Sequence, residues 1–220
     1  MTKLNQKPKI SYYKNHSSNQ IPSFSELLEL FIGEKNNGFF VEVGGFDGKS
    51  FGCTIGLSKR QWSGIYIEPV PKYARKIQRN HKNNPNVQVI QSAVGASKGL
   101  ANLSLRGPLT YVSRGKSNLN TISVELDTLD EILIKNKCPI DFDVLVIDTE
   151  GSESEVLKGF SILKWNPKII VIELHDTDTN NSKVQKNEIG IYQYLLSNYN
   201  YLPMYKDWIN TVFVRNDLIK

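Results

Sequence analysis

The stretch GFFVEVGGFDGKS, residues 38–50, runs from a continuous apolar segment directly into a turn that contains three glycines. The apolar part, 38–45, is typical of a strand that is buried on both faces of a parallel sheet. Glycines at a tight strand-to-helix turn let a ligand approach the backbone, and the start of a following helix offers unpaired N–H groups. The pattern E-x-G-x-x-x-G is neither GxGxxG nor a GxxxxGK[ST] phosphate loop. It is also compatible with glycines that only let the chain turn and bind no ligand.

Outward from this stretch, apolar segments alternate with helical ones. Predicted strands are 38–45, 64–69, 86–95, 101–106, 120–126, 142–148, 168–175, 201–205 and 210–216, and predicted helices are 23–32, 50–62, 71–81, 129–136, 152–160 and 188–198. This order predicts an α/β fold with a mostly parallel, Rossmann-like sheet and helices on both faces. The two closing segments are too close together for a crossover, so the last strand must run antiparallel. Ser152 with Glu155 predicts a capping box at the start of the helix 152–160.

Length and composition indicate one globular domain. The chain has 220 residues, of which 40% are hydrophobic and 22% charged, so we expect a single domain over 23–220 preceded by a flexible basic arm over 1–22. No apolar window is long enough to span a membrane, and the first twenty residues lack the apolar centre of a secretory signal, so we expect a cytoplasmic protein. Cys53 and Cys138 have no partner spacing and are predicted to be free and buried.

Charge is distributed unevenly along the chain. Between Glu68 and Glu125 there are nine basic residues and no acidic one, whereas Glu125 to Asp178 holds thirteen acidic residues against five lysines. A basic surface can attract nucleic acid or a phosphate-bearing substrate, but the spacing of several of these cations also matches the solvated side of one helix. These helix cations are Lys72, Arg75, Lys76, Arg79 and Lys82.

Acidic residues end several predicted strands, where open parallel sheets bind their ligands. Glu68 follows Asp47 by 21 residues, a spacing at which a carboxylate can accept both hydrogen bonds of a ribose diol. Together with the glycine turn it predicts an adenosine-type ligand, although an exposed strand-end acid is the simpler reading of Glu68 alone.

Two further strand ends carry the remaining candidates for chemistry. Asp148 and Glu150 follow one strand, and Glu173 and His175 lie two apart near the end of the next. Carboxylates with one imidazole can bind a divalent ion such as magnesium or manganese, or His175 can act as a general base. The same acids can equally cap helices or pair with the basic block. His16 and His81 lie in polar sequence surroundings and are expected to be solvated.

The ordered motifs FFVEVGGFDGKSF, IYIEP, SAVG, LDTLDEIL, FDVLVIDTEGSESEVLKG and PKIIVIELH, over roughly 38–176, resemble those of the FkbM-type methyltransferases. The resemblance implies a class I methyltransferase fold and an S-adenosylmethionine (SAM)-dependent O-methyltransferase acting on hydroxyls of sugars or related small molecules. It implies cofactor contacts at the methionine end, the ribose and the adenine. The predicted cofactor-binding set is Glu42, Gly44, Gly45, Asp47, Ser50, Glu68, Pro69, Ser92, Ala93 and Asp148.

By the same resemblance, Asp148 and Glu150 match the D-x-E-G element that faces the transferred methyl group. We predict Asp148 and His175 as base candidates, with Glu150 and Glu173 positioning the acceptor or joining a metal site with them, although we expect no tightly held metal. The loop 109–120, with Arg114 and Lys116, is a candidate lid or phosphate contact. Family members often have a lysine where this chain has Val146, so any role of that lysine is missing here.

Three other functions compete with this interpretation. The basic block favours a nucleic-acid methyltransferase acting on RNA ribose, but the sequence shows no evident stacking surface for bases. A nicotinamide dehydrogenase is disfavoured by the glycine pattern. A non-catalytic cofactor-binding scaffold is disfavoured by the acids at three strand ends. The acceptor is therefore expected to be a small-molecule or glycan hydroxyl, with or without a phosphate.

Overall fold

The computed structural model describes residues 11–12, 21, 24–50, 52–113, 120–174, 190–191, 193–195, 197–207 and 209–219. Its central sheet has the strand order β1-β11-β12-β10-β9-β2-β3-β4. The strands are β1 (Ser11–Tyr12), β2 (Phe39–Val43), β3 (Ser63–Ile67), β4 (Val87–Ile90), β9 (Val144–Ile147), β10 (Ile169–Glu173), β11 (Tyr201–Lys206) and β12 (Asn210–Arg215).

The direction of these strands confirms the predicted α/β fold. Strands β4, β3, β2, β9 and β10 pair in parallel, whereas β12 lies between β10 and β11 and runs antiparallel to both. The connection from β11 to β12 is too short for a crossover, which forces this reversal. The carboxyl ends of the five parallel strands therefore meet at one edge of the sheet.

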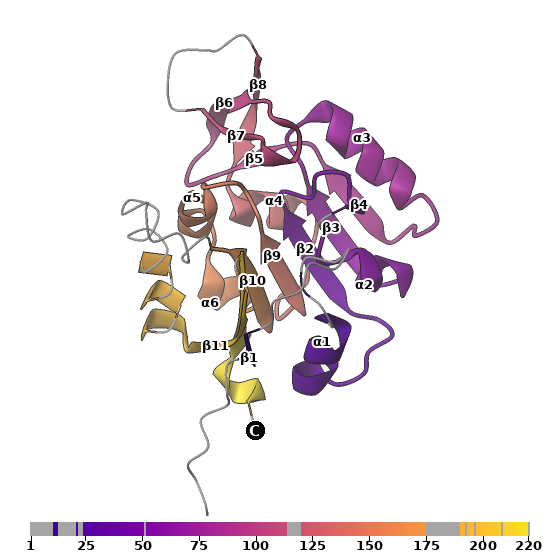
Figure 1. Cartoon of the computed structure of the whole chain (residues 1–220), viewed down its shortest axis with the longest axis vertical. Coiled ribbons are helices and arrows are strands. Elements are labelled where there is room, and N and C mark those ends of the chain that lie inside the picture. Colours follow the sequence, from indigo (N-terminus) through magenta and orange to yellow (C-terminus); the bar gives the residue numbers. More distant parts are fainter. Residues whose placement is uncertain are drawn as a thin grey trace, which may run out of the picture.

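Helices cover both faces of the sheet, as Figure 1 shows. The helices are α1 (Phe24–Ile32), α2 (Ile55–Lys59), α3 (Pro71–Asn80), α4 (Leu129–Lys135), α5 (Glu153–Lys158) and α6 (Ile162–Trp165). Alternate residues of each strand enter different cores because successive side chains point to opposite faces. Val144 and Val146 pack with helices α1–α3, and Leu145 and Ile147 pack with α4–α6 and with the helical residues described between 190 and 199.

A second, four-stranded sheet was not predicted from the sequence. It consists of β5 (Ala93–Val94), β6 (Gly99–Ser104), β7 (Tyr111–Val112) and β8 (Thr121–Asp127), in the order β5-β8-β6-β7, with a short 3-10 turn at Gly107–Leu109. The segment 86–95, expected as one strand, is divided between the two sheets. Figure 1 shows the small sheet at one end of the molecule, beyond the central sheet.

Other predicted boundaries also shift. Helix α2 is shorter than the predicted 50–62, because Gly52 packs beside the Glu42 carboxylate and precedes the helix as a loop. The capping box at Ser152 is wrong, since the Ser152 side chain makes no cap hydrogen bond. Instead, the Glu153 carboxylate accepts hydrogen bonds from the N–H groups of Thr149 and Gly151, each at 3.0 Å.

Part of the segment 1–22 belongs to the fold. Ser11–Tyr12 pair with β11, and Ile21 is fully buried beside Phe24 and Leu28. These residues therefore lie in the domain and not in an arm; the rest of 1–22 is outside the described residues. Both cysteines are buried, as predicted. Within the described residues, no helix is both long and apolar enough to cross a membrane.

Candidate active site

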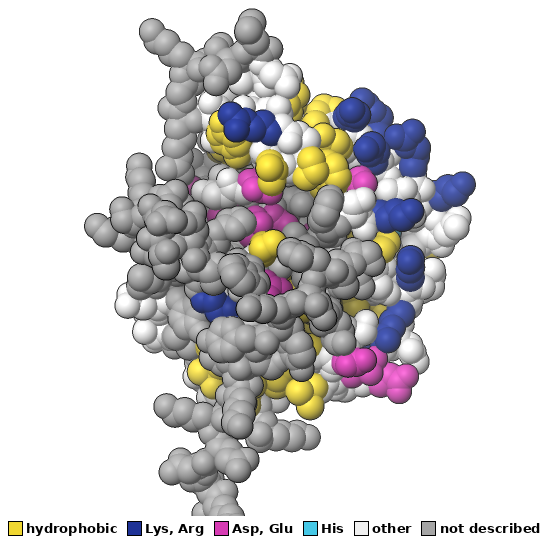
Figure 2. Space-filling model, in the orientation of Figure 1, with side chains coloured by type: hydrophobic (Ala, Val, Ile, Leu, Met, Phe, Trp, Pro, Cys, Tyr) yellow, Lys and Arg dark blue, Asp and Glu magenta, His cyan; other side chains and the backbone are white. Residues whose placement is uncertain are grey.

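A cavity of about 490 Å³ lies at the carboxyl ends of β2, β3, β9 and β10, with the small sheet on its far side. This volume is within the usual range of about 300–1,000 Å³ for small-molecule sites. Nine of the ten predicted cofactor residues line it, all except Asp47. Figure 2 shows acidic side chains gathered near the centre of one face and basic ones along one edge.

The turn after β2 forms one wall and depends on unusual backbone conformations. Gly44 has φ +90°, Phe46 has φ +46° and Gly48 has φ +68°. A β-carbon on Gly44 would lie 1.6 Å from the carbonyl oxygen of Asp148. The sequence suggested that this glycine leaves room for a ligand, but the structure shows that its first role is to let β2 and β9 approach each other.

Glu68 directly follows β3 and faces this turn. Its Oε2 accepts a hydrogen bond from Phe46 N–H at 2.9 Å, and its Oε1 accepts one from Val70 N–H at 2.8 Å. Burial raises the pKa of this carboxyl to about 7, against the two backbone hydrogen bonds that lower it. Since a carboxylate oxygen has about two acceptor positions, each oxygen keeps one for a ligand hydroxyl. Glu68 is thus buried and aligned, and is not the exposed acid of the simpler reading.

Glu42 lies deeper, in β2. Its carboxylate accepts a hydrogen bond from the Thr54 hydroxyl, and its side chain is buried at the base of the cavity. Burial raises the pKa of Glu42 to about 7, with hydrogen bonds from Thr54 and Cys53 opposing the shift. A carboxyl that changes protonation near neutral pH can adapt to a charged or a neutral group bound beside it.

Asp47 does not line the cavity. Its Oδ1 accepts hydrogen bonds from Lys49 N–H and Ser50 N–H, at 3.0 and 2.7 Å, and its Oδ2 accepts one from the Ser50 hydroxyl. These contacts close the turn locally. Asp47 therefore shapes the backbone that reaches Ser50, which does line the cavity.

Two aromatic rings that the sequence analysis missed stand beside Glu68. The rings of Phe46 and Tyr73 have centroids 4.5 Å apart, and Lys76 Nζ lies 5.7 and 5.5 Å from their centroids. Both aromatic residues line the cavity with Pro69, Ser92 and Ala93. The one feature of the sequence that could have indicated these rings is the position of Tyr73, in the first turn of the helix that Pro71 starts.

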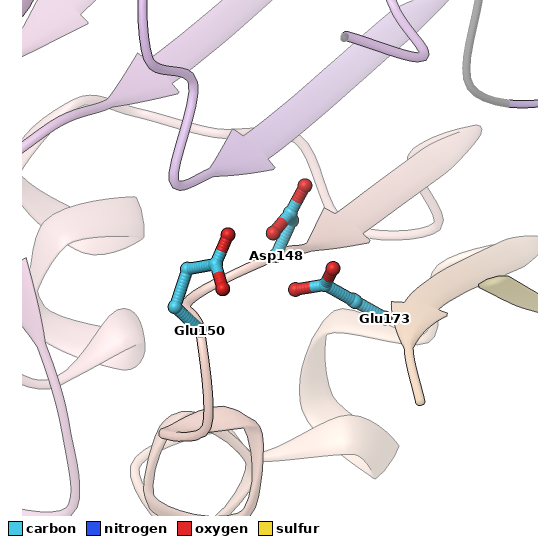
Figure 3. A group of neighbouring side chains, drawn as sticks. All are labelled: Asp148, Glu150 and Glu173. Atoms are coloured by element: carbon cyan, nitrogen blue, oxygen red, sulfur yellow. The ribbon is translucent and has the colours of Figure 1, made fainter. Parts of the chain in front are cut away.

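Three carboxylates gather on the opposite side of the cavity. One oxygen each from Asp148, Glu150 and Glu173 lies within 4.8 Å of the others, and Figure 3 shows the three side chains converging from the end of β9, the turn after it and the end of β10. Glu150 has φ +55° in a turn whose backbone N–H groups, on Thr149 and Gly151, donate to the Glu153 carboxylate. This cluster can accept hydrogen bonds or a proton, or coordinate a cation. His175 lies outside the described residues.

The small sheet and the turn before β7 supply the outer wall, which includes the first residues of the predicted loop 109–120. Its lining residues include Leu103, Arg106, the turn Gly107–Leu109, Thr110 and Val112. Among the described lining residues, Arg106 is the one cation, against the five carboxylates of Glu42, Glu68, Asp148, Glu150 and Glu173. Arg114 and Lys116, predicted as a lid or phosphate contact, are outside the described residues. The cavity is therefore acidic overall.

Val146, which replaces the lysine common in the resembling family, is 2% exposed and packs in the core with Val144 and Val171. The basic helix face is confirmed as exposed on α3 at Lys72, Arg75 and Arg79. His81 differs from the expectation, because it is 6% exposed and buried behind the glycine turn.

The strand order, the glycine turn after β2 and the acid after β3 together define a class I methyltransferase fold. A family model described as "Methyltransferase FkbM domain" matches residues 42–209. The chain therefore belongs to the FkbM methyltransferase family and is a SAM-dependent methyltransferase. No protein with a curated description matches the sequence significantly.

Solved structures show the same fold at low sequence identity. An O-methyltransferase from Bacillus cereus in complex with S-adenosylhomocysteine (SAH) is 15% identical to this chain. The TM-score is 0.51, over 88% of this chain and 81% of that one. A putative O-methyltransferase from Klebsiella pneumoniae is 10% identical, with a TM-score of 0.51 over 89% of this chain and 81% of that one. These likenesses support the fold assignment.

Proposed function

We propose that the cavity binds SAM and that the protein transfers its methyl group to a hydroxyl of a sugar, glycan or related small molecule. The observation that carries this proposal is the carboxylate cluster of Asp148, Glu150 and Glu173, which shares one cavity with Glu68 and the glycine turn. The cavity has both an end suited to an adenosine and an acidic end suited to hydroxyl groups.

The residues present suit the cofactor. Glu68 offers its remaining acceptor positions to a ribose diol, and the backbone of Gly44 and Gly45 lines the same cavity. Phe46 and Tyr73 give apolar surface for a flat base. Glu42, Ser50 and Asp148 lie toward the other end and would contact the amino-acid part.

SAM supplies an electrophilic methyl group bound to a positively charged sulfur. An alcohol is a poor nucleophile at neutral pH, so the protein has to hold the acceptor oxygen in line and accept its proton. We assign proton acceptance to Asp148, with His175 as the second base candidate. Glu150 and Glu173 accept hydrogen bonds from neighbouring hydroxyls of the acceptor and so fix its orientation.

The same three carboxylates are candidate ligands of a magnesium or manganese ion, because their oxygens are close enough to share one cation. His175 is the fourth predicted ligand and lies outside the described residues. A bound ion would acidify the acceptor hydroxyl. Base catalysis and metal assistance make opposite predictions for activity in excess chelator.

The charge of the cavity supports a neutral acceptor over a polyanion. The cluster of Asp148, Glu150 and Glu173, against one arginine among the described lining residues, repels a phosphate backbone. An RNA methyltransferase is the second candidate, favoured by the exposed cations of α3. Their effect on binding is long-range and falls steeply with salt.

The test is transfer of a labelled methyl group from SAM to three acceptor sets at equal concentration: neutral glycosides, sugar phosphates and RNA. We expect label in the neutral glycosides, in an ether that survives base. Label only in RNA would replace this proposal with the second candidate.

A further inference from the structure

The cofactor turn requires support from outside itself. Phe46 has φ +46°, a conformation that costs a non-glycine residue about 1–3 kcal/mol unless its surroundings impose it. On the cavity side, Glu68 binds Phe46 N–H. The contacts on the opposite side of the turn come from the carboxyl end of α3.

His81 follows the last residue of α3 and contacts the turn directly. Its Nε2 lies 2.7 Å from the carbonyl oxygen of Gly48, and its Nδ1 lies 2.7 Å from the Ser58 hydroxyl. Because a carbonyl oxygen can only accept, Nε2 carries the proton and Nδ1 of the neutral ring accepts from Ser58. Burial lowers the pKa of His81, against the bond to Gly48 that raises it, which agrees with a neutral ring.

The surroundings fix the orientation of this ring. The Tyr66 ring lies against it, with centroids 4.7 Å apart. Asn84 holds Ser58 in place by donating to its carbonyl at 3.0 Å and to the Trp62 carbonyl at 2.9 Å. The His81 ring is therefore held by the Ser58 hydroxyl and the Tyr66 ring, and it presents one N–H to the turn.

The neighbouring residue strengthens the arrangement. Asn80 Nδ2 donates to the Asp47 carbonyl at 2.8 Å, so the adjacent carbonyls of Asp47 and Gly48 are bound by the last residue of α3 and the residue after it. A β-carbon on Gly48 would lie 2.7 Å from His81 Nε2. The contact thus leaves no space between turn and ring.

We propose that His81 is a positioning residue that holds the turn Gly44–Ser50 in the shape that receives the cofactor. It acts through the Gly48 carbonyl and is not among the residues that line the cavity. The proposal rests on the proposed function of the cavity as the SAM site. It assigns the buried histidine a role that neither the glycine motif nor the acidic cluster covers.

Two substitutions of the same residue separate the turn contact from packing. His81→Gln places an amide N–H near the position of Nε2 and keeps the bond to Gly48, whereas His81→Asn reaches only the position of Nδ1 and leaves the Gly48 carbonyl without its donor. In SAH titrations by calorimetry, we expect His81→Gln to stay within about 3-fold of wild type and His81→Asn to bind roughly 5- to 20-fold more weakly.

Tyr201→Phe is the matched structural control, since it removes a buried hydrogen bond to the Pro167 carbonyl at the other side of the sheet. It should lower the melting temperature without changing SAH affinity. If His81→Asn does not fold, Asn80→Ala takes its place, because Asn80 is exposed, and we expect about 2- to 5-fold weaker binding.

Nitrogen-15 NMR of the imidazole gives a readout that does not depend on a ligand, and it should show Nε2 protonated and Nδ1 unprotonated. The Nδ1–H tautomer would overturn the proposal. So would wild-type SAH affinity in a folded His81→Asn or, failing that variant, in Asn80→Ala. Wild-type protein that does not bind SAH would instead overturn the proposed function of the cavity.

Discussion

The α-carbon of Gly44 and the carbonyl group of Asp148 are so close that a β-carbon on Gly44 would lie 1.6 Å from the carbonyl oxygen. The two residues directly follow the neighbouring strands β2 and β9, and Asp148 N–H donates to the Val43 carbonyl at 3.0 Å. This approach joins the turn that is proposed to bind the cofactor to the carboxylate that is proposed to accept the proton.

Gly44→Ala should therefore destabilise the whole domain. We expect a loss of at least about 3 kcal/mol in the free energy of unfolding, because the substitution combines a clash with backbone and a φ of +90°. Gly99→Ala is the matched control, since a β-carbon there meets nothing within 4 Å, and its effect should stay within about 0.5 kcal/mol. Urea unfolding measures both; equal stabilities would contradict the close approach.

Stability should depend on pH through Glu42. Its folded pKa of about 7 lies above the ordinary value of 4.5, so the folded protein holds a proton that the unfolded chain releases. The resulting stabilisation is full below about pH 4.5 and is lost as the pH rises through about 7. Between about pH 5 and 8, the wild-type unfolding free energy should fall by up to about 3 kcal/mol more than that of Glu42→Gln. Parallel curves for the two proteins would show that Glu42 titrates normally.

Methyl transfer should continue in excess chelator, because Asp148 is proposed to accept the proton without a metal. Asp148→Asn should then lower kcat by roughly 100-fold or more, the usual range for loss of a general base. The check is a turnover assay in chelator with and without added magnesium or manganese. Activity that disappears and returns with the ion would assign Asp148, Glu150 and Glu173 to a metal site instead.

Neutralising Arg106 in the cavity and neutralising the exposed cations of α3 should change the acceptor KM to different extents. Arg106 lines the cavity and lies over the Tyr111 ring, with 5.5 Å from its Cζ to the ring centroid, so Arg106→Gln should remove hydrogen-bond donors to the acceptor and raise its KM several-fold. Arg75→Gln with Arg79→Gln on the exposed face of α3 should change it little, since exposed charges are screened within about 8 Å at physiological salt. The reverse ranking, with loss of RNA binding, would favour the nucleic-acid candidate.

The central sheet could be predicted because its strands are continuous apolar runs, as in Val144–Ile147 and Ile169–Glu173. Two strands of the small sheet were predicted, as 101–106 and 120–126, but the sheet itself could not be, because its strands are partly exposed and pair far along the chain, as Gly99 does with Leu126. The spacing of apolar residues along the chain does not reveal which distant strands pair with each other. The break in 86–95 has the same cause, since Ala93 leaves the central sheet to pair with Leu126.

The strand-end rule predicted the acidic residues of the site because parallel strands place their carboxyl ends together. Asp47 does not line the cavity, because its carboxylate accepts hydrogen bonds from the backbone of the same turn. The burial of His81 depends on Ser58 and Tyr66, which are distant in sequence. No local pattern around a polar helix end reveals such contacts.

Calorimetric titration of wild type and Glu68→Ala with SAM tests the central claim most directly. Wild type should bind one equivalent, and folded Glu68→Ala should lose about 1.5–3 kcal/mol of binding free energy, the range for hydrogen bonds to a charged group. No binding by the wild type, or unchanged affinity in the variant, would contradict the assignment of this cavity to the cofactor.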